Sequence, residues 1–555
     1  MEHKSTSYHL IAIVLVLALN HIHTKPAFAG ELSLDPSVTS TVRVINRAFA
    51  DEPSQTQRAL TLSPSLSTVY SSRHVTLSML LKQTAITRNG DSGSSNDNYT
   101  DIKLSSQFQL IENLLSLELS AGQSYRARSQ SQLDFSDKVS TPENLAKLQT
   151  DKTLLSFILP NSPYIGLNWQ ASVAHTKTDS AVDDSAVDAV DNGTNGNGNR
   201  VDGSNVSFAA NIYNGRKLKK FTYNFAVQYN DTSRANFQNF KSTNLNGNAG
   251  IRLGNDISVF AQGRVDDYEP KSLGINSSRR NLDSESYGAG LRWQPRENKN
   301  IALSYNQLKQ NQNTSEFVGV STQWAFSPRT SMNFDYGKRF YGESYKFKFN
   351  YNAKSLRSSI SYNEDVTTFG RLDPTTQDVG IFVCTFGSSD LEDCFQPDSL
   401  QYVLQPGEEF RSLADTSSDI TNNVIFRKNG NISIGYQKRK LKASLNVRRG
   451  TTEYIESNRE TTRTSAVLNL GYTLGKRANL SLVTSISEQT PRDDSNKTRT
   501  FVSTLSFSRS FKQNLNASLS LRYAKRNRSD TSPGLIDSSQ ELVDSSLNAS
   551  LAYQF

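Results

Sequence analysis

Residues 221–229 read Phe-Thr-Tyr-Asn-Phe-Ala-Val-Gln-Tyr, and large apolar or aromatic side chains occupy every second position of this run. Successive side chains of a β-strand point to opposite faces, so the run predicts a strand with one apolar and one polar face. No stretch of comparable length has the 3.6-residue period of an amphipathic helix. The chain is therefore predicted to be all-β. The same alternation recurs at 60–66, 165–173, 345–351, 466–472 and 515–523.

The connections between the predicted strands alternate between short and long. Transmembrane barrels have short periplasmic turns and long external loops. To keep short and long connections alternating, residues 154–159 and 164–177 must be two separate strands. For the same reason 420–426 is assigned to a loop. The result is a bacterial outer-membrane antiparallel β-barrel of about 24 strands, within a range of 20 to 26. Short turns fall at 71–73, 112–113, 327–329 and 475–478, and long polar stretches at 89–97, 179–204 and 270–284.

The composition excludes several other classes of protein. The only long apolar run is Leu10 to Leu19, about half of the roughly twenty residues that a membrane-spanning helix needs. With six His and two Cys in 555 residues, haem, iron–sulfur and zinc sites have almost no ligands, so we expect no cofactor and no metal. The basic residues are spread along alternating strands, which argues against nucleic acid as a partner.

Both ends of the chain carry export features. Lys4, the apolar run and Ala27-Phe28-Ala29 predict that residues 1–29 are a cleaved signal peptide. Residues 30–555 then form a single barrel whose first strand begins at about Ser37, with no room for an N-terminal plug. The last strand alternates up to Tyr553 and Phe555, which resembles the C-terminal signal for barrel assembly. We therefore expect a monomer in the cell outer membrane, with membrane lipid and the barrel assembly machinery as partners; a soluble β-solenoid or sandwich is the alternative for the alternating pattern.

Two polar regions are predicted to be long external loops, at 178–204 and 369–429. The second carries Cys384 and Cys394, which an oxidising compartment favours as a disulfide. A loop of about 60 residues is usually functional or disordered, and this one either folds into the lumen or stays outside as a pinned loop. For the first loop, a solvated stretch without a bound ligand is the favoured interpretation. Calcium binding by Asp191, Asn195 and Asn197 is the alternative.

A group of sequence motifs is similar to a known family. The motifs are 281–287, Trp293-Gln294-Pro295, 327–331, 336–342 and 361–368. They resemble the PEP-CTERM system-associated outer-membrane β-barrels, which are encoded with exosortase and exopolysaccharide biosynthesis genes. The mature start at 36–40 is also similar to that family's opening strand. The resemblance covers roughly 281–368 and implies a role in exopolysaccharide export or assembly, with periplasmic export components as candidate partners and without catalytic residues.

The polar faces of the strands carry the candidate site. If the strand positions that carry apolar side chains face lipid, the alternate positions, the opposite parity, point inward. Lys and Arg at these positions would line a cationic path for anionic solutes or acidic sugars. The alternative is that several lie near strand ends and pair with headgroups or loop acids. The lumen-lining candidates are Arg252, Arg339, Lys346, Lys348, Arg357, Lys442, Arg448 and Arg522.

These observations lead to a ranked set of functions. The first is a barrel for export or surface assembly of an exopolysaccharide, with a cationic lumen as conduit and an anionic polymer as the candidate partner. The second is a general or anion-preferring porin. Less favoured are a scaffold around a partner protein and a hydrolase using His175 with Ser180 and Asp179, because nothing in the sequence shows that these three converge. We predict that the protein is not an enzyme.

Overall fold

The computed structural model describes most of the chain from Gly30 to Phe555. The described residues are 30–49, 53–90, 93–127, 135, 137–159, 162–180, 201–235, 239–254, 256–269, 283–296, 298–310, 313–368, 382–385, 394–395, 408–411, 424–455, 459–492, 496–511, 514–530 and 540–555. The predicted signal peptide at 1–29 and the candidate calcium ligands of the first long loop lie outside this set. Among the described residues, no helix is both long and apolar enough to cross a membrane.

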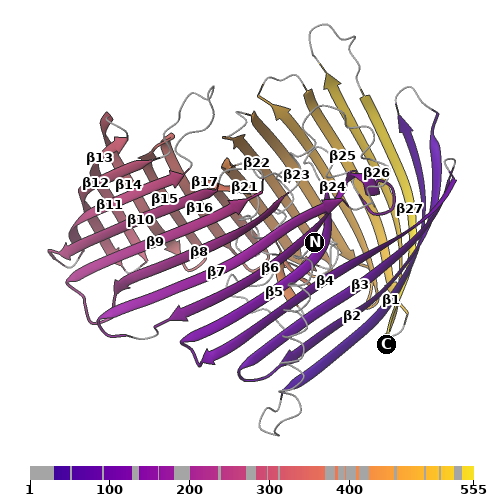
Figure 1. Ribbon diagram of the computed structural model, residues 1–555, viewed down its shortest axis with the longest axis horizontal. Helices are drawn as coiled ribbons and strands as arrows, with labels where there is room; N and C mark the ends of the chain where they lie inside the picture. The colour runs from indigo at the N-terminus through magenta and orange to yellow at the C-terminus, as the bar shows by residue number, and fades with distance from the viewer. Residues whose placement is uncertain are drawn as a thin grey trace.

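Twenty-four antiparallel strands form one closed sheet, which confirms the predicted fold class and strand number. Each strand pairs with its sequence neighbour, and β1 also pairs with β27, beside which it lies in Figure 1. The strands are β1(Glu31–Phe49), β2(Gln55–Ser71), β3(Val75–Gly90), β4(Gly93–Ile111), β5(Leu115–Ala127), β6(Leu145–Ile158), β7(Ile165–Ser180), β8(Asp202–Asn214), β9(Phe221–Arg234), β10(Phe240–Arg252), β11(Ile257–Glu269), β12(Ser284–Arg296), β13(Lys299–Gln310), β14(Asn313–Ser327), β15(Thr330–Arg339), β16(Gly342–Asn352), β17(Leu356–Thr368), β21(Val424–Lys438), β22(Leu441–Tyr454), β23(Arg459–Thr473), β24(Ala478–Pro491), β25(Asn496–Ser510), β26(Leu515–Asp530) and β27(Gln540–Gln554).

The outer face of the barrel is apolar, as a membrane requires. On β2, Leu60 and Leu62 are 51% and 48% exposed, whereas Ala59 on the opposite parity is buried. Such exposure of large aliphatic side chains over a closed sheet is the pattern of a transmembrane barrel, in which no strand edge is left in hydrocarbon. Exposed aromatic residues lie near one end, where short turns join the strands: Tyr164, Phe326, Phe511 and Phe555. They form a girdle of the kind found at membrane interfaces.

The two ends of the barrel differ in their connections. The short-turn end holds connections such as 72–74 and 439–440, and both β1 and β27 reach it. The long-connection end holds the connections 128–144, 181–201 and 369–423. Within the last of these, β18(Phe382–Thr385), β19(Cys394–Phe395) and β20(Glu408–Arg411) form a small separate sheet.

Several predicted boundaries were wrong. β1 begins at Glu31 instead of about Ser37, and β6 begins at Leu145 instead of Leu154. The expected long loop at 89–97 is mostly strand, because β3 and β4 are joined by residues 91–92 alone. Residues 424–429, assigned to a loop, belong to β21. The polar stretches at 89–97 and 145–153 lack the period-two pattern of apolar residues that marks a lipid-facing strand, whereas 424–426 is assigned to a loop only by the alternation of connection lengths.

Candidate lumenal constriction

The eight predicted lumen-lining residues all lie on the strand face opposite the exposed apolar side chains. Arg522, for example, lies between Leu521 and Tyr523, whose side chains are exposed on the outer face. The eight do not form one ring. Arg252, Arg357 and Lys442 lie at the short-turn end, where Arg252 donates to Gln294 and Arg357 to Asn352. The others lie farther from the short-turn end, toward the long-connection end: Arg339, Lys346, Lys348, Arg448 and Arg522.

A segment that connects β5 to β6 lies against the inner wall. We call Phe135 and residues 137–144 the β5–β6 segment. Its contacts come from strands that are distant in sequence: Arg43 of β1 donates to Asp137, and Arg47 of β1 donates to the carbonyl of Ser140 at 3.3 Å. Arg88 of β3 donates to the carbonyls of Lys138 and Val139, both at 2.6 Å. The segment is therefore held inside the barrel by three arginines of the wall.

Asp137 organises the turn within this segment. Its carboxylate accepts from the backbone N–H groups of Val139 and Ser140, at 2.7 and 2.6 Å, and from Arg43 at 3.1 Å. Burial alone would raise the pKa of Asp137, but the Arg43 guanidinium and the Ser140 and Val139 donors together lower that pKa below its ordinary value. The carboxylate form thus fixes both the turn and its attachment to β1. Thr141 closes the turn by donating its hydroxyl to the Phe135 carbonyl at 2.6 Å.

Lys138, the next residue, lies in an aromatic and acidic niche. Its ammonium group is 5.6 Å from the Tyr99 ring centroid and 4.9 Å from that of Tyr125. It also forms an ion pair with Asp101 of β4. Burial lowers the pKa of Lys138, while Asp101 acts in the opposite direction. Cation–π contacts and an ion pair therefore hold the side of the segment that faces β4 and β5.

Phe135 packs at the other side of the segment, against β25 to β27. It is 4% exposed and forms a cluster with Ala524 and Leu542, with Val502 at the margin. The guanidinium of Arg526 lies 5.2 Å from its ring centroid, and that of Arg522 lies 6.0 Å away. The Phe135 ring thus packs against apolar side chains and also lies next to two arginine guanidinium groups of the lumen wall.

The arginines around Phe135 outnumber their described carboxylates. Asp544 of β27 is 1% exposed and binds Arg47 at 2.9 Å and Arg522 at 3.4 Å. Arg526 lies diagonally across β27 from Arg47, because Leu542 pairs with Arg526 and Asp544 pairs with Arg47. This patch, which we call the β1–β26 arginine patch, consists of Arg43, Arg47, Arg522 and Arg526 against Asp137 and Asp544. Among the described residues, this part of the inner wall carries a net positive charge.

Sequence reasoning found only Arg522 of this patch. The parity rule would also have found Arg43, which lies between the outward-facing Val42 and Val44. Arg47 has the same parity as Arg43. No periodic signal marks Phe135 or Asp137, because the segment is neither strand nor amphipathic helix. Its position inside the barrel is set by contacts with strands as distant in sequence as β1, β26 and β27, and a single sequence does not show such contacts.

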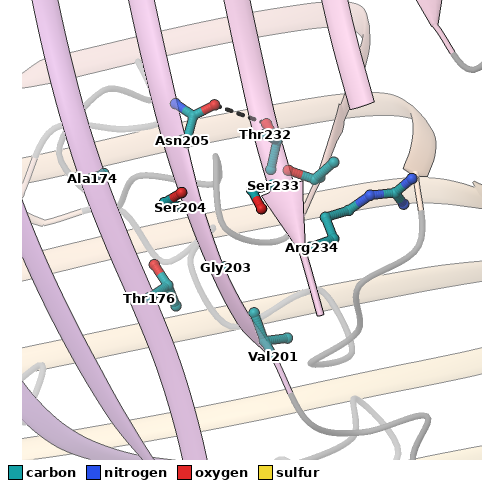
Figure 2. Close-up of a pocket in the computed structure, with 10 residues that line it drawn as sticks. Ala174, Thr176, Val201, Gly203, Ser204, Asn205, Thr232, Ser233 and Arg234 are labelled. Atoms are coloured by element: carbon teal, nitrogen blue, oxygen red, sulfur yellow. Dashed lines mark hydrogen bonds between the residues drawn. The ribbon is translucent and has the colours of Figure 1, made fainter. Parts of the chain in front are cut away.

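A second element narrows the lumen from the opposite side. At the long-connection end of β17 and β21, the last three positions of β17 (366–368) and the first four of β21 (424–427) are buried whichever face they belong to, with exposures of 1–8%. Thr368 also lines a small pocket with β7, β8 and β9, shown in Figure 2, where Asn205 and Thr232 point toward one another and hydrogen-bond at 2.8 Å. The pocket volume of about 20 Å³ admits roughly one water molecule, so it is no sugar site.

The hydrolase alternative finds little support in the geometry. His175 lies on the outer face, and its Nε2 is 3.9 Å from Asp202 Oδ1, with both side chains nearly half exposed. Asp179 binds Lys177 at 3.3 Å instead of approaching His175. The side chain of Ser180 is outside the described part of the structure. Among the described residues no cluster of three or more potential metal ligands occurs.

The two cysteines are brought together in backbone register. Cys384 of β18 lies directly opposite Cys394 of β19 in an antiparallel ladder. Directly opposite residues in such ladders have Cα atoms about 4.5–5.5 Å apart, a separation that a disulfide spans. The disulfide stays a prediction that this register permits.

No protein-family model and no curated protein matches the chain. Solved structures resemble it in architecture. The FrpB iron transporter from Neisseria meningitidis (F3-3 variant) is 11% identical, with a TM-score of 0.43, covering 94% of this chain and 81% of that chain. The siderophore receptor PirA from Pseudomonas aeruginosa is 10% identical, with a TM-score of 0.36, covering 94% and 80%. The copper transporter OprC is 10% identical, with a TM-score of 0.38, covering 96% and 84%. The functions in these names belong to those proteins.

Proposed function

We propose that this barrel is an outer-membrane conduit for the export or surface assembly of an acidic exopolysaccharide. The observation that carries the proposal is the net positive β1–β26 arginine patch on the inner wall, next to the β5–β6 segment. A surface of one sign inside a narrow passage concentrates solutes of the opposite charge and speeds their entry. The resemblance of 281–368 to the PEP-CTERM system-associated barrels supports an exopolysaccharide as the polymer.

The barrel has the size for such a passage. Neighbouring strands lie about 4.8 Å apart and tilt by about 40°, so a round barrel of this strand number is about 48 Å across between backbones. Side chains alone do not fill an opening of this width, and wide barrels have either a water-filled channel or a plug. Here the β5–β6 segment and the ends of β17 and β21 occupy part of the interior. We infer that they set the diameter and the charge of the path.

Ion selectivity in a planar bilayer tests this function. Under a salt gradient, we expect the mature protein to give an anion-selective reversal potential, because the arginine patch lies on the path. Replacing Arg47 and Arg526 with Gln should reduce the selectivity severalfold. The matched control is Arg499→Gln, since Arg499 is 67% exposed and pairs with Glu488 on the outer face. A cation-selective wild type, or equal selectivity in both variants, would contradict the proposal.

Polymer block separates the conduit from the second candidate, an anion-preferring porin. Polygalacturonate added to the bath should block the current at concentrations at which neutral dextran of equal size has no effect. The block should weaken in the Arg47→Gln/Arg526→Gln variant, because the polymer carboxylates would lose their partners. Equal block by both polymers, or by neither, would favour the porin.

A further inference from the structure

The ends of β17 and β21 leave the barrel wall and turn into the lumen. Lower on β21 the burial alternates as a wall strand requires, with Ile432 and Ile434 exposed on the outer parity and Asn431 and Ser433 buried on the inner one. From Arg427 upward the alternation stops, and both parities are buried. A strand of a single-layered barrel has one face toward lipid or solvent, so burial of both faces places this end inside the barrel.

The backbone pairing breaks at the same level. The ladder between β16 and β17 runs only from Asn352↔Arg357 to Phe347↔Tyr362. Above it, residues 342–346 of β16 and 363–368 of β17 have no pairing with each other, although β17 continues to pair with β21 up to Thr368↔Val424. The inward turn of β17 and β21 therefore leaves a gap in the hydrogen-bonded ladder beside β16, which we call the seam.

An aromatic chain holds the inserted end in place. Phe426 of β21 contacts Tyr341 of the β15–β16 turn, with ring centroids 4.5 Å apart. Tyr341 contacts Phe340, Phe340 contacts Tyr268 of β11, and Tyr268 stacks on Phe240 of β10, at centroid distances of 5.0, 5.3 and 6.3 Å. β10 and β21 are separated around the wall by seven strands, so this chain of rings bridges the interior.

The inserted position leaves polar atoms unsatisfied. Asp365 Oδ1, Thr368 Oγ1 and Arg427 Nε are buried without a hydrogen-bond partner within the described structure, although Arg427 donates another N–H to Asp365 at 3.2 Å. Buried polar atoms without partners are costly. The apolar cluster thus favours insertion, whereas these atoms favour a position with access to water.

The sequence of β17 also fits a position in the wall. Continuing the β16–β17 register places Asn363 opposite Lys346, Glu364 opposite Tyr345 and Asp365 opposite Ser344. In that position Val366 and Phe426 face lipid, as their parity requires, and Asp365 and Arg427 face the aqueous lumen. Unpaired strand edges readily accept a partner strand. The edge of β16 is therefore a docking surface, and its occupant is the upper half of β17.

We propose that β17 and β21 form a gate with two positions. In the closed position, seen here, their ends lie across the lumen on the aromatic chain. In the open position, residues 363–367 pair with 342–346 of β16 and the seam closes. The ends of β17 and β21 then no longer lie across the lumen. The inference rests on the proposed conduit only for its electrical readout, because the movement itself changes which residues are neighbours.

Cysteine cross-linking tests the movement. In a background with Cys384 and Cys394 replaced by Ser, we would combine Ser344→Cys with Asp365→Cys, which the continued register places directly opposite each other in the open position. The matched control is Asn350→Cys with Ser359→Cys, a pair that is opposite in the existing ladder and whose native side chains hydrogen-bond at 3.0 Å. Both pairs face inward, and cross-linking is scored by gel mobility after proteolysis between them.

We expect the control to cross-link at once with unchanged conductance. The Ser344→Cys/Asp365→Cys pair should cross-link slowly and raise the conductance severalfold, and reduction should reverse the rise. Failure of this pair to cross-link while the control does so would overturn the gate. Cross-linking without a change in conductance would also overturn it, if the background protein conducts. Cross-linking in a barrel that never conducts would leave the movement standing and remove the conduit function instead.

Discussion

At the scale of single residues, Asp137 is the side chain on which the β5–β6 segment depends most. It accepts from two backbone N–H groups and from Arg43, and a third of its side chain is exposed. The wall positions around it are readable from sequence, since Arg43 and Arg47 occupy the parity opposite to that of the outward-facing Val42 and Val44. Asp137 itself is not, because its role arises only when the segment meets β1.

Acidification should release the segment through Asp137. The pKa of its carboxyl is lowered in the docked state, so docking is complete above the ordinary carboxyl pKa of about 3.9 and is lost as the pH falls through the lower docked value. Asp137→Asn should weaken docking by about 1–2 kcal/mol at neutral pH, because a charge-assisted hydrogen bond is lost. Protease accessibility of 128–144 against pH measures both effects. A wild type and variant with identical pH profiles would contradict this role.

At the scale of elements, the strands that face lipid were predicted and those that leave the wall were not. The alternation at 221–229 reappears as β9, and the connection parity correctly separates β6 from β7. At 424–429 the rule of alternating connection lengths assigned to a loop residues that belong to β21, of which 424–427 are buried on both faces. The failure therefore coincides with the part of the barrel that is folded inward.

Phe426→Ala should shift the gate toward the open position. Its ring contacts Tyr341, and the loss of a buried Phe costs about 3–5 kcal/mol in a packed core, so the substitution destabilises the inserted state more than the state in which residue 426 faces lipid. Single-channel records should show an open fraction at least tenfold higher. Ile434→Ala is the control, because Ile434 lies on the same strand and parity but faces lipid. Similar records from both variants would show that the aromatic chain does not hold the gate.

At the scale of the whole molecule, the strand number and the closed sheet followed from the sequence, whereas the filling of the lumen did not. Strand alternation is a local property of the sequence, and it can be recognised in each strand separately. The docking of Phe135 on β26 and of Tyr268 on Phe340 depends on which walls face each other, and this becomes defined only when the sheet has closed. The candidate site is therefore less predictable than the barrel that holds it.

Asp544→Asn should weaken the whole barrel. Asp544 is almost fully buried and paired with Arg47 of β1 and Arg522 of β26, so its loss leaves two guanidinium groups without their carboxylate, a change that costs about 3 kcal/mol or more. The temperature at which the barrel loses its compact mobility on detergent gels should fall by several degrees. Asp335→Asn, at an exposed inward position bonded to Ser321, should leave it unchanged. Equal temperatures for the two variants would contradict this role of Asp544.

The pairing of β1 with β27 also sets the order in which the chain can fold. Every other pairing in the wall joins strands that are adjacent in the barrel sequence, and such hairpins can form as soon as both partners are present. The β1–β27 ladder joins residues as far apart as Arg47 and Asp544, and the N–H of Phe555 donates to the Pro36 carbonyl. Contacts at such sequence separation form slowly. The opening strand must therefore wait with one unpaired edge until the last strand arrives, and a chaperone that shields that edge would protect the protein for the whole of this interval.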